Sequence, residues 1–249
     1  MFPSLTTAQW GMAILAAFGV GMSKAGLPGI SLFHVVVMAH LFPGAASTGV
    51  VLPMLVCGDI AAVIAFRRDA RWSYLWRTLP PAMVGVVVGW WIMQRMKSQH
   101  FGPAIGGLVL ALAALQMARQ RRPAAFAVIP HSRMFGLTMG FIAGITTMIA
   151  NAAGPVMGLY LLAVSLPKKE FVGTSAWFFL AINVFKLPFS VQLGLITSKT
   201  LIFNATLVPL ILFGLFCGHQ VVTRVPQRWF DTLILGFAVI AAIKLMGLF

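Results

Sequence analysis

Long, almost uncharged apolar runs recur along the whole chain and restrict what it can fold into. Each run is close to the roughly 20 residues that a helix needs to cross a hydrocarbon layer about 30 Å thick. The runs cover approximately residues 10–41, 47–66, 74–94, 102–118, 134–165, 172–192, 201–223 and 229–248. Hydrophobic residues make up 60% of the 249 residues and charged residues only 9%, too few to form the surface of a soluble domain. The sequence therefore predicts a membrane protein that crosses the bilayer several times.

These runs are predicted to be helices rather than strands of a barrel. A transmembrane strand alternates apolar and polar residues over about ten positions, whereas residues 82–93 are apolar at every position. The net charge of +14 does not indicate a nucleic-acid partner, because the basic residues fall in short connectors between the runs. The expected fold class is an all-α polytopic membrane protein.

The longest polar connector, around residues 123–133, divides the chain into two similar halves, residues 1–122 and 134–249, of one membrane domain. Each half opens with an overlong apolar segment that glycine and proline interrupt. The first interruption contains "SKAGLPG" and is followed by "STGVV"; the second contains "NAAGP" and is followed by "GTSAW". Pro28 corresponds to Pro155, and Thr48 to Thr174. Paired interruptions at matching positions of two halves indicate the binding site of a transporter.

The distribution of Lys and Arg favours interrupted segments that enter and leave the membrane on one side. That arrangement gathers twelve basic residues on one side and leaves four on the other, Arg95, Lys97, Lys199 and Lys244. Eight full crossings would give ten and six, a weaker bias for the cytoplasmic side. Each half is then a re-entrant segment followed by three crossings, the halves are inverted repeats, and both termini lie outside the cytoplasm. A single unwound helix that tilts across the membrane is the alternative.

The interruptions are candidates for an anion-binding site. Backbone that leaves helical geometry at membrane depth needs protein or water around it. The helices expected to restart at Ile30 and Val156 present free N–H groups and positive dipole ends, and Lys24 lies beside the first of them. The alternative is that these glycines and prolines only let helices pack. The residues expected to bind substrate are Ser23, Lys24, Gly26, Gly29, Thr48, Asn151, Gly154, Thr174, Asn183 and Lys186.

Two ionisable residues stand inside the segments that follow the interruptions, where charges are costly and usually functional. Asp59 is a candidate proton carrier, and Lys186 is either a substrate ligand or the countercharge of Asp59. The alternative is a buried pair that serves packing alone. His34, His40 and His219 are expected at the membrane interface, because no spacing of His, Cys, Asp or Glu resembles a metal site. No metal or other cofactor is expected.

The stretches "GMSKAGLPG" and "STGVVLPMLVCGD", then "NAAGPVMGLYLL" and "KKEFVGTSAWFFLAINVFKLP", resemble the sulfite exporter TauE/SafE family of bacterial membrane permeases. The resemblance covers nearly the whole chain. It implies transport of small sulfur-containing anions, such as sulfite, sulfoacetate or other organosulfonates, across the bacterial inner membrane. The family pattern often has more glycines in the first interruption than this chain has.

Other function classes fit the sequence less well. An intramembrane protease would need a Ser/His dyad, an HExxH helix or two catalytic aspartates, so we expect no enzyme. An uncoupled anion channel is the main alternative to a secondary transporter, because the same helix ends could select anions. The expected partners are a small anion, membrane lipid and protons as coupling ion, and not nucleic acid. The sequence leaves open whether the chain forms a homodimer.

Overall fold

A computed structural model describes residues 5–25, 30–121 and 133–224, together with residues 239, 240, 243 and 246. Within these residues all regular structure is helical, as predicted. The helices are α1 (Thr7–Lys24), α2 (Ile30–Leu41), α3 (Ala46–Phe66), η1 (Arg67–Asp69), α4 (Trp72–Arg95), α5 (Ser98–Arg121), α7 (Arg133–Ala150), α8 (Gly154–Ala163), α9 (Lys168–Gln192) and α10 (Ser198–Arg224). Most of the segment expected at 229–248 and most of the connector expected at 123–133 lie outside the described residues.

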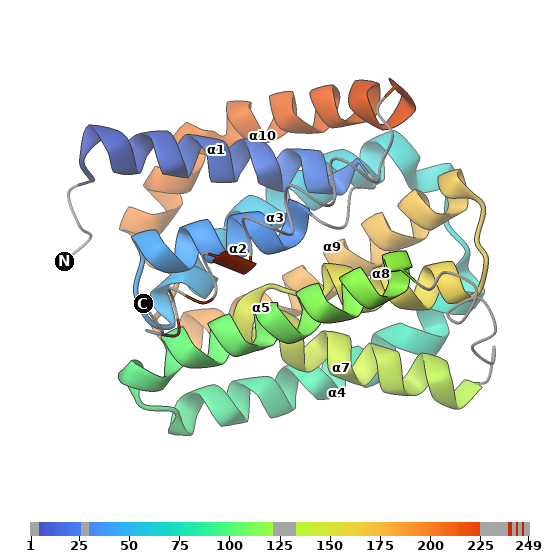
Figure 1. Cartoon of the computed structure of the whole chain (residues 1–249), viewed down its shortest axis with the longest axis horizontal. Helices are drawn as coiled ribbons and strands as arrows, with labels where there is room; N and C mark the ends of the chain where they lie inside the picture. The colour runs from blue at the N-terminus through green and yellow to red at the C-terminus, as the bar shows by residue number, and fades with distance from the viewer. Residues whose placement is uncertain are drawn as a thin grey trace.

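Two pairs of helices fold back on themselves as hairpins (Figure 1). In the first, α1 runs inward and α2 returns, so that Gly19 lies beside Ile30 and Phe33. In the second, α7 runs inward and α8 returns, and the rings of Phe135 and Tyr160 lie 5.7 Å apart near the outer ends of the two helices. The hairpins enter the molecule from opposite ends, so their inner ends meet in its interior.

The turn of the second hairpin consists of residues 151–153, all buried. Asn151 has a φ of 53°, in the left-handed region that asparagine tolerates better than most residues. The helix restarts at Gly154, so the expected start at Val156 is wrong by two residues. The reason is Pro155, which lacks an N–H group and therefore fits within the first helical turn, where no intrahelical donor is needed.

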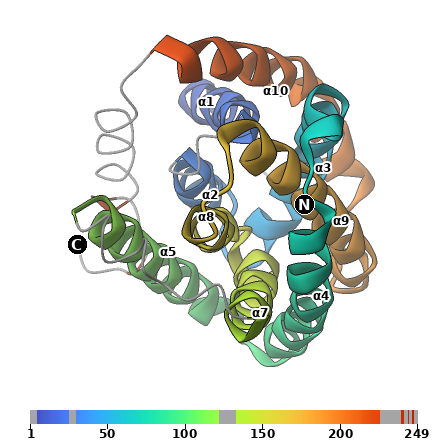
Figure 2. The ribbon, with the colours of Figure 1, turned by 90° about the vertical axis from the view of Figure 1, so that its right-hand side faces the viewer.

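The other helices surround the hairpins (Figure 2). Seen along the long axis, α10, α3, α9 and α4 form an arc around a central row of α1, α2, α8 and α7, and α5 packs on α2 and α8 from the other side. By length and composition, α7, α9, α10 and α3 with the turn that follows it are apolar enough to cross a membrane. The described part of the chain is thus a helical bundle of the multi-pass membrane type.

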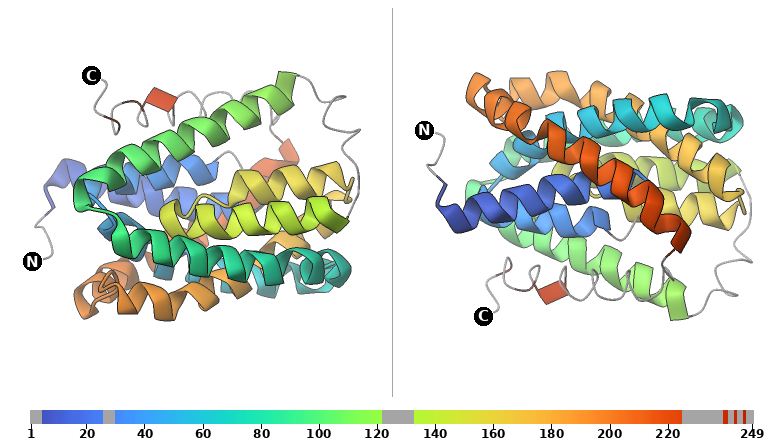
Figure 3. Two further views of the ribbon diagram at one scale, coloured as in Figure 1. Left: turned by 90° about the horizontal axis from the view of Figure 1, so that it is seen from below. Right: turned by 90° about the horizontal axis from the view of Figure 1, so that it is seen from above.

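Glycines let the first helix of each hairpin come very close to a helix of the other half. A Cβ atom at Gly21 of α1 would overlap the carbonyl oxygen of Ile211 in α10, and Gly214 of α10 meets the backbone of α1 in the same way. Figure 3 shows the resulting crossing of α1 and α10. In the other half, a Cβ atom at Gly144 of α7 would overlap the carbonyl oxygen of Ala82 in α4. Small residues at such crossings are how membrane helices approach closely.

The connector after η1 contacts α9, and the α9–α10 connector contacts α3, so each sequence half contacts a helix of the other. The Arg71 guanidinium, just after η1, donates two hydrogen bonds of 2.6 and 2.7 Å to Glu170 of α9, and its backbone N–H donates to Thr174 Oγ1 at 2.9 Å. Gly173 packs against the same connector, and Gly49 of α3 packs against the α9–α10 connector at the opposite end. α3 and α9 are therefore fixed at opposite ends of the molecule.

The α4–α7 crossing gives a test of this packing. We expect Gly144→Ala to destabilise the protein by about 1–3 kcal/mol, because the added methyl group meets backbone that cannot rotate away. The matched control is Gly107→Ala in α5, where the added Cβ has no neighbour within 4 Å. Thermal unfolding of both variants in detergent measures the difference. Equal unfolding temperatures for the two variants would show that α4 and α7 can move apart to accommodate the methyl group without loss of stability.

Candidate functional site

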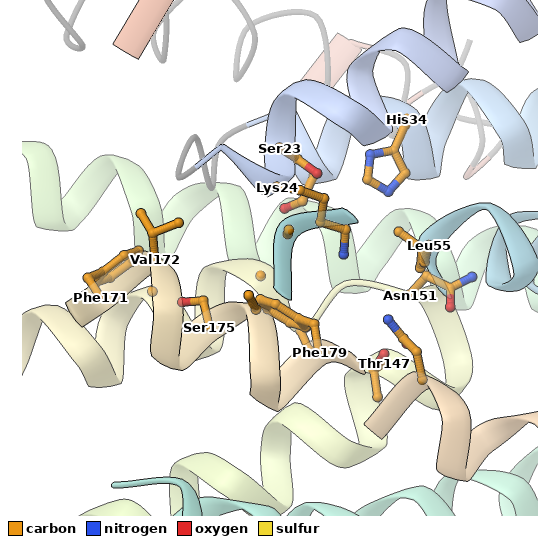
Figure 4. Close-up of a pocket in the computed structure, with 17 residues that line it drawn as sticks. Ser23, Lys24, His34, Leu55, Thr147, Asn151, Phe171, Val172, Ser175 and Phe179 are labelled. Atoms are coloured by element: carbon orange, nitrogen blue, oxygen red, sulfur yellow. The ribbon is translucent and has the colours of Figure 1, made fainter. Parts of the chain in front are cut away.

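A pocket lies among the inner ends of the two hairpins, α3 and α9 (Figure 4). The space enclosed by its lining, together with the open solvent at its mouth, is about 670 Å³. Ser23, Lys24 and His34 line one wall, and Ser175 and Thr147 lie across from them. The apolar lining comes from α3, the turn before α8, and α9, and includes Leu55, Ala62, Ala153, Phe171, Val172, Ala176 and Phe179. An apolar cavity with a few convergent polar groups is the usual form of a ligand site.

Lys24 in the last turn of α1 forms an ion pair with Asp59 of α3. Lys24 Nζ lies 2.6 Å from Asp59 Oδ1, and the two side chains are 8% and 0% exposed. The stem of Lys24 crosses Gly58, which has no side chain to obstruct it, and the ammonium lies 4.9 Å from the centroid of the Phe179 ring. Lys24 lines the pocket and Asp59 does not. The carboxylate is therefore a counter-ion placed behind the lysine, as a buried charge requires.

Asn183 of α9 joins this ion pair to a second lysine. Its Nδ2 donates to Asp59 Oδ2 at 2.7 Å, and its Oδ1 accepts from Lys186 Nζ at 3.4 Å. Lys186 Nζ also donates to Asn151 Oδ1 at 2.6 Å, and Asn151 Nδ2 donates to the backbone carbonyl of Thr48 at 3.0 Å. A continuous chain of polar contacts thus runs from α1 through α3 and α9 to the turn of the second hairpin.

Lys186 closes the end of α7 where the second hairpin breaks. Its Nζ donates to the Thr147 carbonyl at 2.8 Å and to Thr147 Oγ1 at 3.1 Å. The last carbonyls of a helix lack intrahelical donors and form its negative end, so an ammonium there is favourable. With Asn151 and Asn183, four oxygen atoms surround the three N–H groups of Lys186, so none of these donors is left for a ligand. Because Lys186 does not line the pocket, Lys24 is the lysine that faces a ligand.

The structure brings most of the predicted site residues together. Five of them line the pocket: Ser23, Lys24, Asn151, Gly154 and Asn183. Two lie behind it in the polar chain: Lys186, and Thr48 through its backbone carbonyl. Thr174 lies elsewhere, in the contact with the connector after η1. Gly26 and Gly29 fall outside the described residues. The anticipated proton carrier, Asp59, is in direct contact with Lys24 rather than Lys186.

Sequence analysis missed several residues of the site, chiefly Thr147, Ser175 and Phe179. Thr147 stands one helical turn before Asn151, a spacing that is visible in the sequence. The expectation that His34 is interfacial is wrong, because its side chain is 1% exposed and lines the pocket. The sequence did offer one indication that His34 belongs to the site: it stands one turn after the interruption that Lys24 precedes.

Comparison with known proteins gives one match. The family model described as "Sulfite exporter TauE/SafE" matches residues 13–245, nearly the whole chain, which confirms the resemblance found in the sequence. No curated protein and no solved structure gave a match. Within the described residues no three His, Cys, Asp or Glu side chains gather as a metal site. The match and the bundle of apolar helices lead to one conclusion: the chain belongs to the sulfite exporter TauE/SafE family of membrane transporters.

Proposed function

We propose that the protein is a proton-coupled secondary transporter that moves small sulfur-containing anions, such as sulfite, sulfoacetate or other organosulfonates, across the bacterial inner membrane. The observation that supports this most is the Lys24–Asp59 pair in the pocket wall. Asp59 holds an anionic oxygen 2.6 Å from the ammonium, the kind of contact that a substrate oxygen would make. The carboxylate and the substrate anion would therefore compete for the same lysine.

The charges of the site suggest how protons couple to anions. The polar chain contains two lysines and one aspartate, so it has a net charge of +1 when all three are ionised. A bound monoanion balances that charge. Protonation of Asp59 removes the counter-ion of Lys24 and leaves the ammonium to an incoming anion, since an unpaired buried charge is costly. A proton on Asp59 and an anion on Lys24 would then move together. With Asp59 protonated the polar chain has a charge of +2, which a bound dianion would balance.

The hairpins are proposed to be re-entrant, and the two halves to be inverted repeats. α2 and α8 contain 12 and 10 residues, about 18 and 15 Å at 1.5 Å per residue, too short for a layer of about 30 Å. Their ends lie at the same end of the molecule as the starts of α1 and α7, respectively (Figure 1). The end that includes η1 and the start of α9 is rich in basic residues, which supports its placement in the cytoplasm.

Single cysteines test this topology in a background without the two native cysteines. Thr7 and Pro43, at the outer ends of the first hairpin, should react with an impermeant thiol reagent added outside intact cells. Met134 and Pro167, at the outer ends of the second hairpin, should react only after permeabilisation. All four positions are exposed in the structure. Labelling of Thr7 and Pro43 from opposite sides would mean that the first interrupted segment crosses the membrane.

Removal of the carboxylate tests coupling. We expect Asp59→Asn to abolish accumulation of radiolabelled sulfite driven by a pH gradient in proteoliposomes, while exchange of labelled for unlabelled sulfite continues. The amide keeps a hydrogen-bonding group beside Asn183 but cannot take up a proton. Asp69→Asn in η1, outside the pocket, is the control. Unchanged accumulation in Asp59→Asn would show that Asp59 is structural and that any coupled proton travels on the substrate.

Removal of the ammonium tests the anion site. Lys24→Met should weaken sulfite binding by about 1.5–3 kcal/mol, the worth of a hydrogen bond to a charged group, or roughly ten- to a hundredfold in Kd. Lys24→Arg should recover only part of the loss, because a planar guanidinium does not replace a compact ammonium. Isothermal titration calorimetry on variants with wild-type elution profiles measures the effect.

Two further variants interpret the lysine result. Lys97→Met, between α4 and α5 and exposed, controls for loss of a positive charge. The double variant Lys24→Met/Asp59→Asn removes both members of the ion pair and therefore avoids an unpaired buried carboxylate. It should fold and still bind weakly. Wild-type affinity in Lys24→Met or in the double variant Lys24→Met/Asp59→Asn would refute the proposed anion site at the first hairpin.

A further inference from the structure

His34 stands in the second turn of α2, on the pocket wall beside Lys24 (Figure 4). Its side chain is only 1% exposed, so it is not a solvated surface histidine. Gly19 of α1 packs against His34, since a Cβ atom added to Gly19 would lie 4.0 Å from the Cβ atom of His34. The glycine thus lets the ring lie close to the inner end of the first hairpin. The ring is therefore held at the place where the ammonium of Lys24 also faces the cavity.

Neither ring nitrogen of His34 makes a hydrogen bond of acceptable geometry within the residues that the structure describes. The backbone carbonyl of Ile30, one turn earlier in α2, accepts at most a weak hydrogen bond from one ring nitrogen, so the ring proton is free to reside on the nitrogen that faces the cavity. An imidazole has at least one N–H donor in either of its protonation states. Buried donors are almost always paired, and an unpaired one costs about as much as a lost hydrogen bond. A donor that is unpaired and lines a cavity is an unfilled binding position.

We propose that His34 binds the substrate directly, by donating a ring N–H to one oxygen of the anion while Lys24 contacts another. The proposal rests on the proposed function and adds to it a specific ligand from the returning helix of the first hairpin. Sulfite and sulfonates offer three oxygens around one sulfur atom, so two donors on the same wall can each reach a different oxygen. His34 would thereby fix the orientation of the anion, and Lys24 would supply the charge.

The test is calorimetric binding of sulfite, sulfoacetate and methanesulfonate to the purified full chain in detergent. His34→Leu removes the donor at similar volume and should raise Kd about ten- to a hundredfold for each probe that the wild type binds. His34→Gln keeps an N–H donor and should bind more tightly than His34→Leu. The matched control is His40→Leu in the last turn of the same helix, whose side chain is exposed and which should bind as the wild type does.

A second measurement needs no altered site. In protein labelled with ¹⁵N-histidine, addition of a bound probe should shift the ring resonances of His34, which are assigned by their loss in His34→Gln. An unchanged His34 resonance in the presence of saturating probe overturns the proposal, whether or not His34→Leu folds. So does wild-type affinity in a folded His34→Leu variant.

The outcomes separate this inference from the proposed function. If Lys24→Met loses affinity and His34→Leu does not, the anion site stands and His34 only packs. If His34→Leu and His34→Gln weaken binding equally while His40→Leu does not, the volume of the ring matters and its N–H does not, and the proposal is wrong. If the wild type binds none of the three probes, the proposed function fails and this inference fails with it.

Discussion

Charged side chains can be buried among apolar helices only when each has a partner, and here the partners form one connected chain. Lys24 contacts Asp59, Asn183 links Asp59 to Lys186, and Lys186 contacts Asn151 in the turn of the second hairpin. Removal of either Lys24 or Asp59 would leave the other buried without its counter-ion, at a cost that can exceed the gain from the pair itself. The chain therefore ties the inner ends of both hairpins to α3 and α9.

Close backbone contacts bring the members of this chain within reach of one another. Gly21 and Gly214 bring α1 against α10, and Gly144 brings α7 against α4, each at a distance that no larger residue permits. Gly58 leaves room for the stem of Lys24 to lie flat across α3 and reach Asp59. Since helices in lipid gain little from the hydrophobic effect on association, such contacts supply much of the packing energy. The same glycines set the depth at which the hairpins end.

The sequence was a good guide where a residue conflicted with its surroundings. Lys24, Asp59 and Lys186 are charges within apolar runs, and Asn183 stands one turn from Lys186, so each was identifiable without coordinates. All four belong to the polar chain. Ile30, the first described residue after the glycines and proline of the first interruption, is already helical, which agrees with the predicted restart there.

The sequence was a poor guide where the role of a residue depends on tertiary contacts. Thr174 corresponds to Thr48 in the sequence, yet its hydroxyl accepts a hydrogen bond from the backbone N–H of Arg71. It does not line the pocket, although its neighbours Val172 and Ser175 in α9 do. His34 belongs to α2, a largely apolar helix. Which side of α2 faces the cavity is set by its packing on α1, and the sequence of α2 alone does not indicate it. Sequence similarity between the halves thus does not assign equivalent chemistry to the residues that it pairs.

The two sequence halves carry different charges at the positions that the proposed repeat would make equivalent. In the first half the hairpin contributes a lysine and the following helix an aspartate; in the second half the hairpin contributes Asn151 and the following helix Lys186. Lys186 is fully occupied by neutral oxygens at the end of α7, so its charge acts on the pocket without being available to a ligand. Lys24 contacts one carboxylate oxygen and the face of Phe179, and in the proposed mechanism a proton neutralises that carboxylate. A symmetric site with two equivalent lysines would hold an anion tightly from both sides and release it slowly. In the proposed mechanism the asymmetry leaves Lys24 as the one exchangeable cation of the polar chain, and exchange is what transport would require.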